Sequence, residues 1–245
     1  MSLGDHLEEL RARLILAILG LAVGAVVCLF FGKQILGFIE WPYTLLMQNH
    51  PELSRLKYWS PPEAFAAYMK ISVMAGLILS SPWVFYQLWM FVAAGLYAHE
   101  RRYVRCAVPF SAGLFIAGAL FFLRFVAPLS LEFFLRFGNY IGAEAMWTLQ
   151  KYVSFITLLM LVFGIGFQTP IAVFIVNRTG LVSIRALGRS RKYVFLAVFV
   201  VAAIATPPDV ISQVTLALPL YLLFELGILL SYLAARKKAR ESEKS

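Results

Sequence analysis

Long apolar runs constrain this chain more than any other feature of its sequence. The stretches LILAILGLAVGAVVCLFF and SFITLLMLVFGIGF contain no charged residue. A helix of about 20 apolar residues crosses the roughly 30 Å hydrocarbon core of a bilayer. Only 14 % of the residues are charged and 61 % are hydrophobic, which is too apolar for a soluble domain. The sequence therefore predicts an all-α polytopic membrane protein.

Six candidate transmembrane helices follow from these runs, and the loops between them are too short for a separate soluble domain. We expect a single integral membrane domain over residues 1–245, ending in a basic tail at 234–245, with spans at about 14–31, 70–94, 104–126, 152–176, 193–206 and 211–233. The fifth span is short, since about 13 apolar residues make roughly 20 Å of helix. The sixth is interrupted by Gln213, Pro219 and Glu225, so its apolar stretch is short as well.

Basic residues set the expected orientation, because Lys and Arg are retained on the cytoplasmic side of a membrane. If the N-terminus is inside, that side holds most of the 22 Lys and Arg residues, including Arg101, Arg102 and the basic tail. Both termini are therefore assigned to the cytoplasm. The net charge of +9 then follows from topology and suits contact with anionic membrane lipid, so no nucleic-acid partner is needed to explain it.

The second span has a distinct start. In SPPEAFAAYMK, Ser60 is placed to cap the helix, Pro61 to occupy its first position and Glu63 to complete a capping box. We expect the helix to begin outside the membrane and Pro82 to disturb it further along. The outer loops carry aromatic residues and the segment LEFFLRF, which is typical of an interfacial cap.

No enzyme signature is found in the sequence. His6, His50 and His99 fall at separate places along the chain, so they assemble neither a metal cluster nor a nucleophile with its base. There is no phosphate-binding loop of the nucleotide-hydrolysing type. We therefore expect no catalytic residues, no metal and no cofactor.

Several polar residues stand in apolar surroundings. Glu225 lies well inside the sixth span, and such an acid either carries function or pairs with a basic residue near the cytoplasmic edge. Gln168 precedes Pro170 in the fourth span, where interhelical hydrogen bonding is the simpler role. In ATPPDVISQ, between the last two spans, Thr206, Asp209 and Gln213 either cap helix ends or serve a partner.

Two acids flank spans at the predicted cytoplasmic face. Glu9 stands one helical turn before Arg13, and Glu100 stands beside Arg101 and Arg102. Ordinary electrostatics at helix ends explain such positions. Two carboxylates at one membrane face are also suited to accept paired N–H donors from guanidinium groups. Both interpretations stay open on the residues alone.

Five motifs along the chain together resemble a known family. HLEELRARL before the first span, LYAHERR after the second, FGIGFQTP in the fourth, and TPPDVISQ with LFELG around the sixth look like the twin-arginine translocase subunit TatC. The match runs from about His6 to Leu233. The motifs are specific in combination, whereas each alone is weak.

The resemblance implies six helices in a cupped-hand arrangement in a bacterial-type inner membrane. It implies a protein transport function in which twin-arginine signal peptides of folded proteins are bound at the cytoplasmic face. Export would be driven by the proton-motive force, with the single-span proteins TatA and TatB as partners in homo- and hetero-oligomers.

The resemblance also carries residue roles. It assigns signal-peptide binding to Glu9, Glu100, Phe91, Arg101 and Arg102. Pro42 corresponds to an outer-loop position that affects transport. Thr206, Asp209 and Gln213 correspond to the place where partner helices dock, and Glu225 corresponds to the sixth-helix acid.

One position departs from the family pattern, since Gln168 stands where many members have Glu. A glutamine carries no charge at any pH, so a proton-carrying role at this position is not expected here. Two other functions stay open on the sequence. Glu225 and Gln168 could line the site of a secondary transporter for a small solute, and a purely structural scaffold would make Glu9 and Glu100 dispensable.

Overall fold

The regular elements of the chain are helices throughout the part that the structure describes. This computed structural model describes residues 3–94, 101–180, 182–205 and 210–242. The chain divides into two compact units, Met1–Gly164 and Ile165–Ser245. Each unit is described by itself, and the expectation of one membrane domain stays a prediction.

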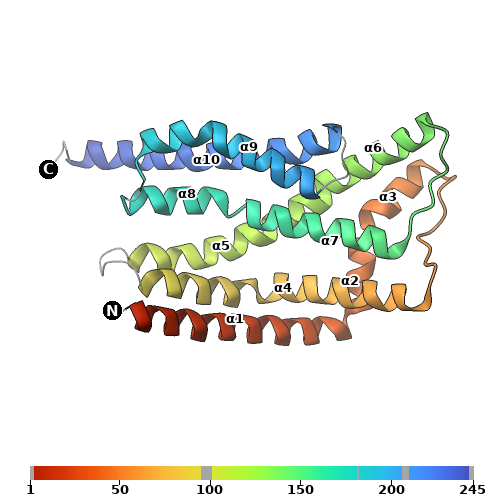
Figure 1. Ribbon diagram of the computed structural model, residues 1–245, viewed down its shortest axis with the longest axis horizontal. Coiled ribbons are helices and arrows are strands. Elements are labelled where there is room, and N and C mark those ends of the chain that lie inside the picture. Colours follow the sequence, from red (N-terminus) through yellow and green to blue (C-terminus); the bar gives the residue numbers. More distant parts are fainter. Residues whose placement is uncertain (1–2, 95–100, 181, 206–209, 243–245) are drawn as a thin grey trace. The chain divides into compact units, whose positions relative to one another are not determined.

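The first unit is built on three long helices, α1 (Leu3–Phe30), α4 (Pro61–Ala94) and α5 (Arg101–Phe121). Helix α4 packs along both α1 and α5. The start of α1, the end of α4 and the start of α5 lie at one end of this unit (Figure 1). The short helices α2 (Gly32–Ile39) and α3 (Trp41–Asn49) lie at the other end, so the unit has two distinct ends that α1 and α4 connect.

Small residues let α1 and α4 approach closely. Gly20, Gly24 and Cys28 recur every four residues and therefore share one face of α1. A Cβ on Gly24 would lie 2.8 Å from the carbonyl oxygen of Gly76 on α4. Since lipid tails are as apolar as leucine, membrane helices associate through such close packing rather than through a hydrophobic difference.

Helix α4 begins as the sequence predicts and continues through its proline. Pro61 is its first residue, and the carboxylate of Glu63 accepts the backbone N–H of Trp59 at 2.7 Å. The expected capping box is therefore shifted by one residue, from Ser60 to Trp59. Pro82 has no N–H for the carbonyl oxygen of Ile78, and the hydroxyl of Ser81 donates to that oxygen at 2.7 Å instead. This bond satisfies a carbonyl group that the proline would otherwise leave unpaired.

The helix that contains the third predicted span continues further than the apolar run of that span. Helix α5 passes through a π-helical turn, Phe122–Val126, into α6 (Ala127–Tyr140) without a loop. The segment LEFFLRF is therefore helical rather than part of a loop. The π-helical turn holds Arg124, whose guanidinium carbon lies 4.7 Å from the ring centre of Trp41.

The end of the unit at α2 and α3 forms a cap fixed by polar contacts. His50 bonds the carboxylate of Glu132 on α6 at 3.1 Å, and Arg136 donates to the same carboxylate at 2.6 Å. The hydroxyl of Tyr43 donates to the carbonyl oxygen of Ser54 at 2.6 Å. Backbone N–H groups of Lys57 and Leu149 join the loop before α4 to the segment before α7 (Leu149–Gly166), with residues 57 and 148 in a β-bridge.

The second unit contains α8 (Thr169–Arg178), α9 (Ile184–Ala205) and α10 (Val210–Ser242). Helix α10 packs against both α8 and α9. The buried core of this unit is formed by Val173, Leu187, Phe224 and Ile228. The end of α8, the start of α9 and the end of α10 lie at one end of this unit (Figure 1).

Within the described residues, five helical stretches are long and apolar enough to cross a membrane: Leu7–Phe30, Pro61–Ala93, Ala107–Tyr140, Leu149–Arg178 and Gln213–Arg236. These stretches make the chain a multi-pass membrane protein. Helix α9, the expected short fifth span, is not among them because its first half carries four basic residues, so the count of six stays a prediction. The stretch Gln213–Arg236 overlaps the predicted sixth span, and helix α10 continues through Pro219 and Glu225.

Candidate functional site

Those predicted signal-peptide residues that the structure describes fall at the end of unit 1 where α1 begins. Glu9 lies in the second turn of α1, and Phe91 lies near the end of α4. Arg101 and Arg102 begin α5 at the same end, but their side chains, and all of Glu100, lie outside the described residues. The structure therefore gives geometry for Glu9 and its neighbours only.

Glu9 belongs to a short polar chain that joins α1 to α4. Arg13 is one turn further along α1, and its Nη2 lies 3.5 Å from Oε1 of Glu9. Nη1 of Arg13 donates to Oε1 of Gln87 on α4 at 3.2 Å. The side chains of Glu9 and Arg13 are 24 % and 26 % exposed, so both are partly shielded from water. One guanidinium thus connects an accessible carboxylate to a buried amide.

Gln87 is a residue of this site that was not predicted from the sequence. It is 2 % exposed, in the apolar run VFYQLWM of α4. A buried amide needs hydrogen-bond partners, because leaving it unpaired costs about 1–3 kcal/mol. Its one available signal was a glutamine within an otherwise apolar span. Beside it, Nε1 of Trp89 donates to the hydroxyl of Ser111 at 2.8 Å, which ties α4 to α5.

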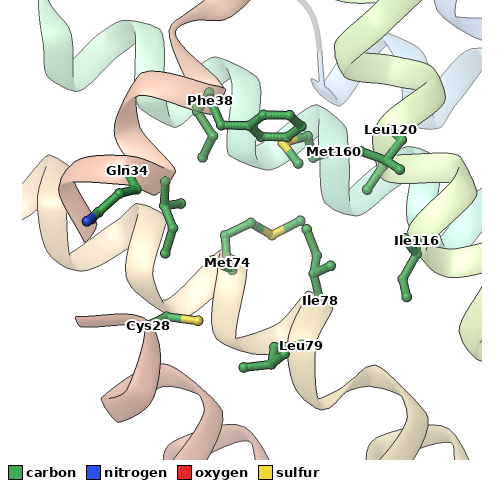
Figure 2. A pocket seen from close by; sticks show the side chains of 13 residues that line it. Cys28, Gln34, Phe38, Met74, Ile78, Leu79, Ile116, Leu120 and Met160 are labelled. Atoms are coloured by element: carbon green, nitrogen blue, oxygen red, sulfur yellow. The ribbon is translucent and has the colours of Figure 1, made fainter. Parts of the chain in front are cut away.

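An apolar pocket of about 430 Å³ lies in unit 1 among α1, α2, α4, α5 and α7. Phe38 and Met160 lie on one side of it and Met74 on the other (Figure 2). Cys28, Ile116 and Leu120 complete much of its wall. Methionine side chains adapt to irregular partners, so this pocket suits apolar groups of varied shape.

Pro42 lies in the cap of unit 1 and is fully buried. It is the second residue of α3, directly after Trp41, on which Arg124 stacks. A proline is well accommodated in the first turn of a helix, where its missing N–H has no intrahelical acceptor.

Glu225 is paired in unit 2. Arg191 on α9 donates to its Oε2 at 2.8 Å, and the hydroxyl of Tyr221, one turn earlier on α10, donates to Oε1 at 2.8 Å. Glu225 therefore has a basic partner, as one of the two interpretations of this acid predicts. The pairing residue is Arg191, near the start of α9.

The remaining predicted partner residues are placed as follows. Nε2 of Gln213 donates to the carbonyl oxygen of Phe199 at 3.0 Å, joining α10 to α9. Gln168 lies in the turn between α7 and α8 and directly precedes α8, whose second residue is Pro170. Thr206 and Asp209 lie outside the described residues. No group of three or more His, Cys, Asp or Glu side chains in the described ranges is arranged to hold a metal ion.

The comparisons with known proteins agree with the motifs. The family model described as Sec-independent protein translocase protein (TatC) matches residues 5–219. The Sec-independent protein translocase protein TatC of Aquifex aeolicus is 37 % identical over 97 % of this chain and 98 % of its own length. That of Desulforapulum autotrophicum is 35 % identical over 98 % of this chain and 88 % of its own length.

Solved structures agree as well. A crystal structure described as the twin-arginine translocase receptor TatC superposes with a TM-score of 0.83 at 36 % identity, and it covers 94 % of this chain and 99 % of that one. A second, described as the same receptor in the detergent DDM, gives a TM-score of 0.84. This chain therefore belongs to the TatC family of Sec-independent protein translocase proteins.

Proposed function

We propose that this chain is the receptor subunit of a twin-arginine protein translocase in a bacterial cytoplasmic membrane, with both termini in the cytoplasm. The observation that carries the proposal is the nearly full-length match to the TatC family, together with the placement of the family's acid Glu9 at one end of unit 1. Its ligand would be the paired arginines of a signal peptide.

The chemistry at Glu9 supports an arginine ligand. Its carboxylate is partly shielded, and Oε2 makes no hydrogen bond within the described residues. A guanidinium binds a carboxylate through two parallel N–H bonds, which a lysine ammonium cannot reproduce. Glu100, which directly precedes α5 in the chain, would receive the second guanidinium.

The apolar pocket supports a place for the rest of the signal peptide. Along α1, 19 residues separate Glu9 from Cys28 in the pocket wall, about 28 Å at 1.5 Å per residue. The apolar stretch of a signal peptide has about 7–15 residues, so it covers this distance when partly extended. We assign the arginines to the Glu9 end and the apolar stretch to the pocket.

Partner binding is assigned to unit 2. TatA and TatB, the single-span partners implied by the family, would dock near Gln213, Thr206 and Asp209, and proton-motive force would drive the subsequent transport. Gln168 carries no charge, so it would contribute hydrogen bonds only. The pairing of Glu225 with Arg191 and Tyr221 also supports this role over a small-solute transporter, because it gives the intramembrane acid a structural partner.

Binding of a fluorescent twin-arginine signal peptide to the detergent-solubilised protein tests the proposal. We expect it to bind at least about tenfold more tightly than a twin-lysine peptide, which corresponds to about 1.4 kcal/mol. The double variant Glu9→Gln, Glu100→Gln should lose this preference. Glu144→Gln, in an exposed loop at the other end of unit 1, is the matched control and should keep it. Equal affinity for both peptides in the unaltered protein would refute the proposed function.

A further inference from the structure

The contact between Arg13 and Gln87 has a consequence for ligand choice. Gln87 is buried, and the oxygen of its amide faces the guanidinium of Arg13. The opposite orientation of the amide would place two donors together, so the contact also fixes which atom is the oxygen. Arg13 is therefore fixed at one side by a partner that does not leave when a ligand binds.

The second contact of Arg13 is weaker. Its Nη2 lies 3.5 Å from Glu9, whereas charge-assisted bonds between guanidinium and carboxylate are commonly about 2.7–2.9 Å long. The ion pair is therefore long, and the other terminal nitrogen of the same guanidinium is bonded to Gln87. Glu9 keeps a cation nearby and yet stays available.

Arg13 and a signal-peptide arginine would compete for the same carboxylate. An incoming guanidinium that forms two short bonds replaces one long contact, and Arg13 retains Gln87 when it is displaced. A lysine ammonium brings a single point charge, so it gains less over the resident arginine. The competitor thus discriminates between the two ligands.

Resting on the proposed function, we infer that Arg13 and Gln87 are positioning residues that set the specificity of Glu9. Gln87 limits how strongly Arg13 pairs with Glu9, and Arg13 in turn excludes ligands that cannot bind the carboxylate bidentately. Without Gln87, Arg13 would have only Glu9 as a partner, would pair with it more strongly and would block ligand binding to its carboxylate. Without Arg13, Glu9 would accept twin-lysine peptides more readily.

Gln87→Leu tests the first half of this inference, because it replaces the amide with an apolar side chain of similar size. Twin-arginine binding should weaken about fivefold, which corresponds to about 1 kcal/mol for one strengthened ion pair. Adding Arg13→Gln to Gln87→Leu should restore binding, since the blocking guanidinium is then gone. A defect that was merely structural would not be repaired by removing a second side chain.

Matched variants separate competition from charge. Arg11 is exposed, two residues before Arg13 on α1, so Gln87→Leu with Arg11→Gln removes one positive charge without removing the competitor. This control should stay as weak as Gln87→Leu alone. In Arg13→Gln alone, the ratio of twin-arginine to twin-lysine affinity should fall about fivefold.

The outcomes also separate this inference from the proposed function. One outcome is that the unaltered protein discriminates the two peptides while the Gln87→Leu variant binds the twin-arginine peptide with the same affinity as the unaltered protein. In that case the inference is wrong and the function stands. The inference is equally overturned if the Arg13→Gln addition fails to restore binding, or if Arg11→Gln restores it as well. Lack of discrimination in the unaltered protein would instead contradict the function itself.

Discussion

Gly76 on α4 is the position where one added methyl group should perturb the molecule most clearly. A Cβ there would lie 2.5 Å from Cα of Ala25 and 2.8 Å from the carbonyl carbon of Gly24, both backbone atoms of α1. Ordinary van der Waals contact begins at 3.4 Å, so Gly76→Ala requires the helices to separate by about 1 Å. Because backbone cannot rotate away as a flexible side chain does, we expect a cost of about 1–3 kcal/mol.

Thermal unfolding of the purified protein in detergent measures this cost. At about 2–4 °C per kcal/mol for a chain of this size, the melting temperature should fall by roughly 2–12 °C. Gly113→Ala in α5 is the matched control, since a Cβ at that position meets nothing within 4 Å. Because alanine favours a helix over glycine by about 0.5–1 kcal/mol, the control should be as stable as the unaltered protein or slightly more stable.

The same variant tests whether helix packing positions the proposed binding site. Separation of α1 from α4 would move Arg13 away from Gln87, so Gly76→Ala should also weaken twin-arginine peptide binding. The reasoning would be refuted if Gly76→Ala and Gly113→Ala melted at the same temperature. Such a result would mean that α1 and α4 do not pack backbone to backbone at this point.

Two further predictions concern charged groups elsewhere in the chain. Arg191→Gln leaves Glu225 with Tyr221 as its remaining partner within the described residues, and because Arg191 is 52 % exposed, the loss of stability in thermal unfolding should be limited to about 1 kcal/mol. Arg185→Gln, on the exposed surface of the same helix, is the control and should have no effect. Equal losses in both variants would contradict the pairing. Burial raises the pKa of Glu40, between α2 and α3, above its ordinary value of 4.5. Its contribution to stability is therefore fully present below pH 4.5 and lost as the pH rises through the raised pKa. Melting temperatures measured from pH 4 to 8 should consequently fall less in Glu40→Gln than in the unaltered protein, and identical curves would count against a buried carboxyl.

Much of the fold could be predicted from local patterns. The start of α4 at Pro61 follows from residues within one turn of each other, and the membrane helices follow from runs of apolar residues. The apolar run of the third predicted span ends near Val126, whereas the backbone stays helical through α6, so the run by itself does not predict where the helix ends. An apolar run indicates which residues suit the hydrocarbon core of a bilayer. A helix, in contrast, continues as long as its backbone hydrogen bonds do.

The candidate site was predicted less completely. Glu9 was identified from its motif, and its spacing to Arg13 made their contact foreseeable. Gln87 was missed, since its partner lies 74 residues away on another helix. The alternatives for Glu225 stayed open for the same reason, until Arg191, 34 residues away, was found to pair with it.

The sequence by itself determined the class of protein, its long apolar helices and the family, because these depend on composition, apolar periodicity and short motifs. Only the tertiary structure decided which helix faces meet, and thus that Arg13 connects Glu9 to a buried glutamine. The physical reason is that lipid and neighbouring helices are equally apolar to a membrane helix. Its hydropathy therefore shows that it is embedded, while close packing at small residues and hydrogen bonds between distant positions select its neighbours.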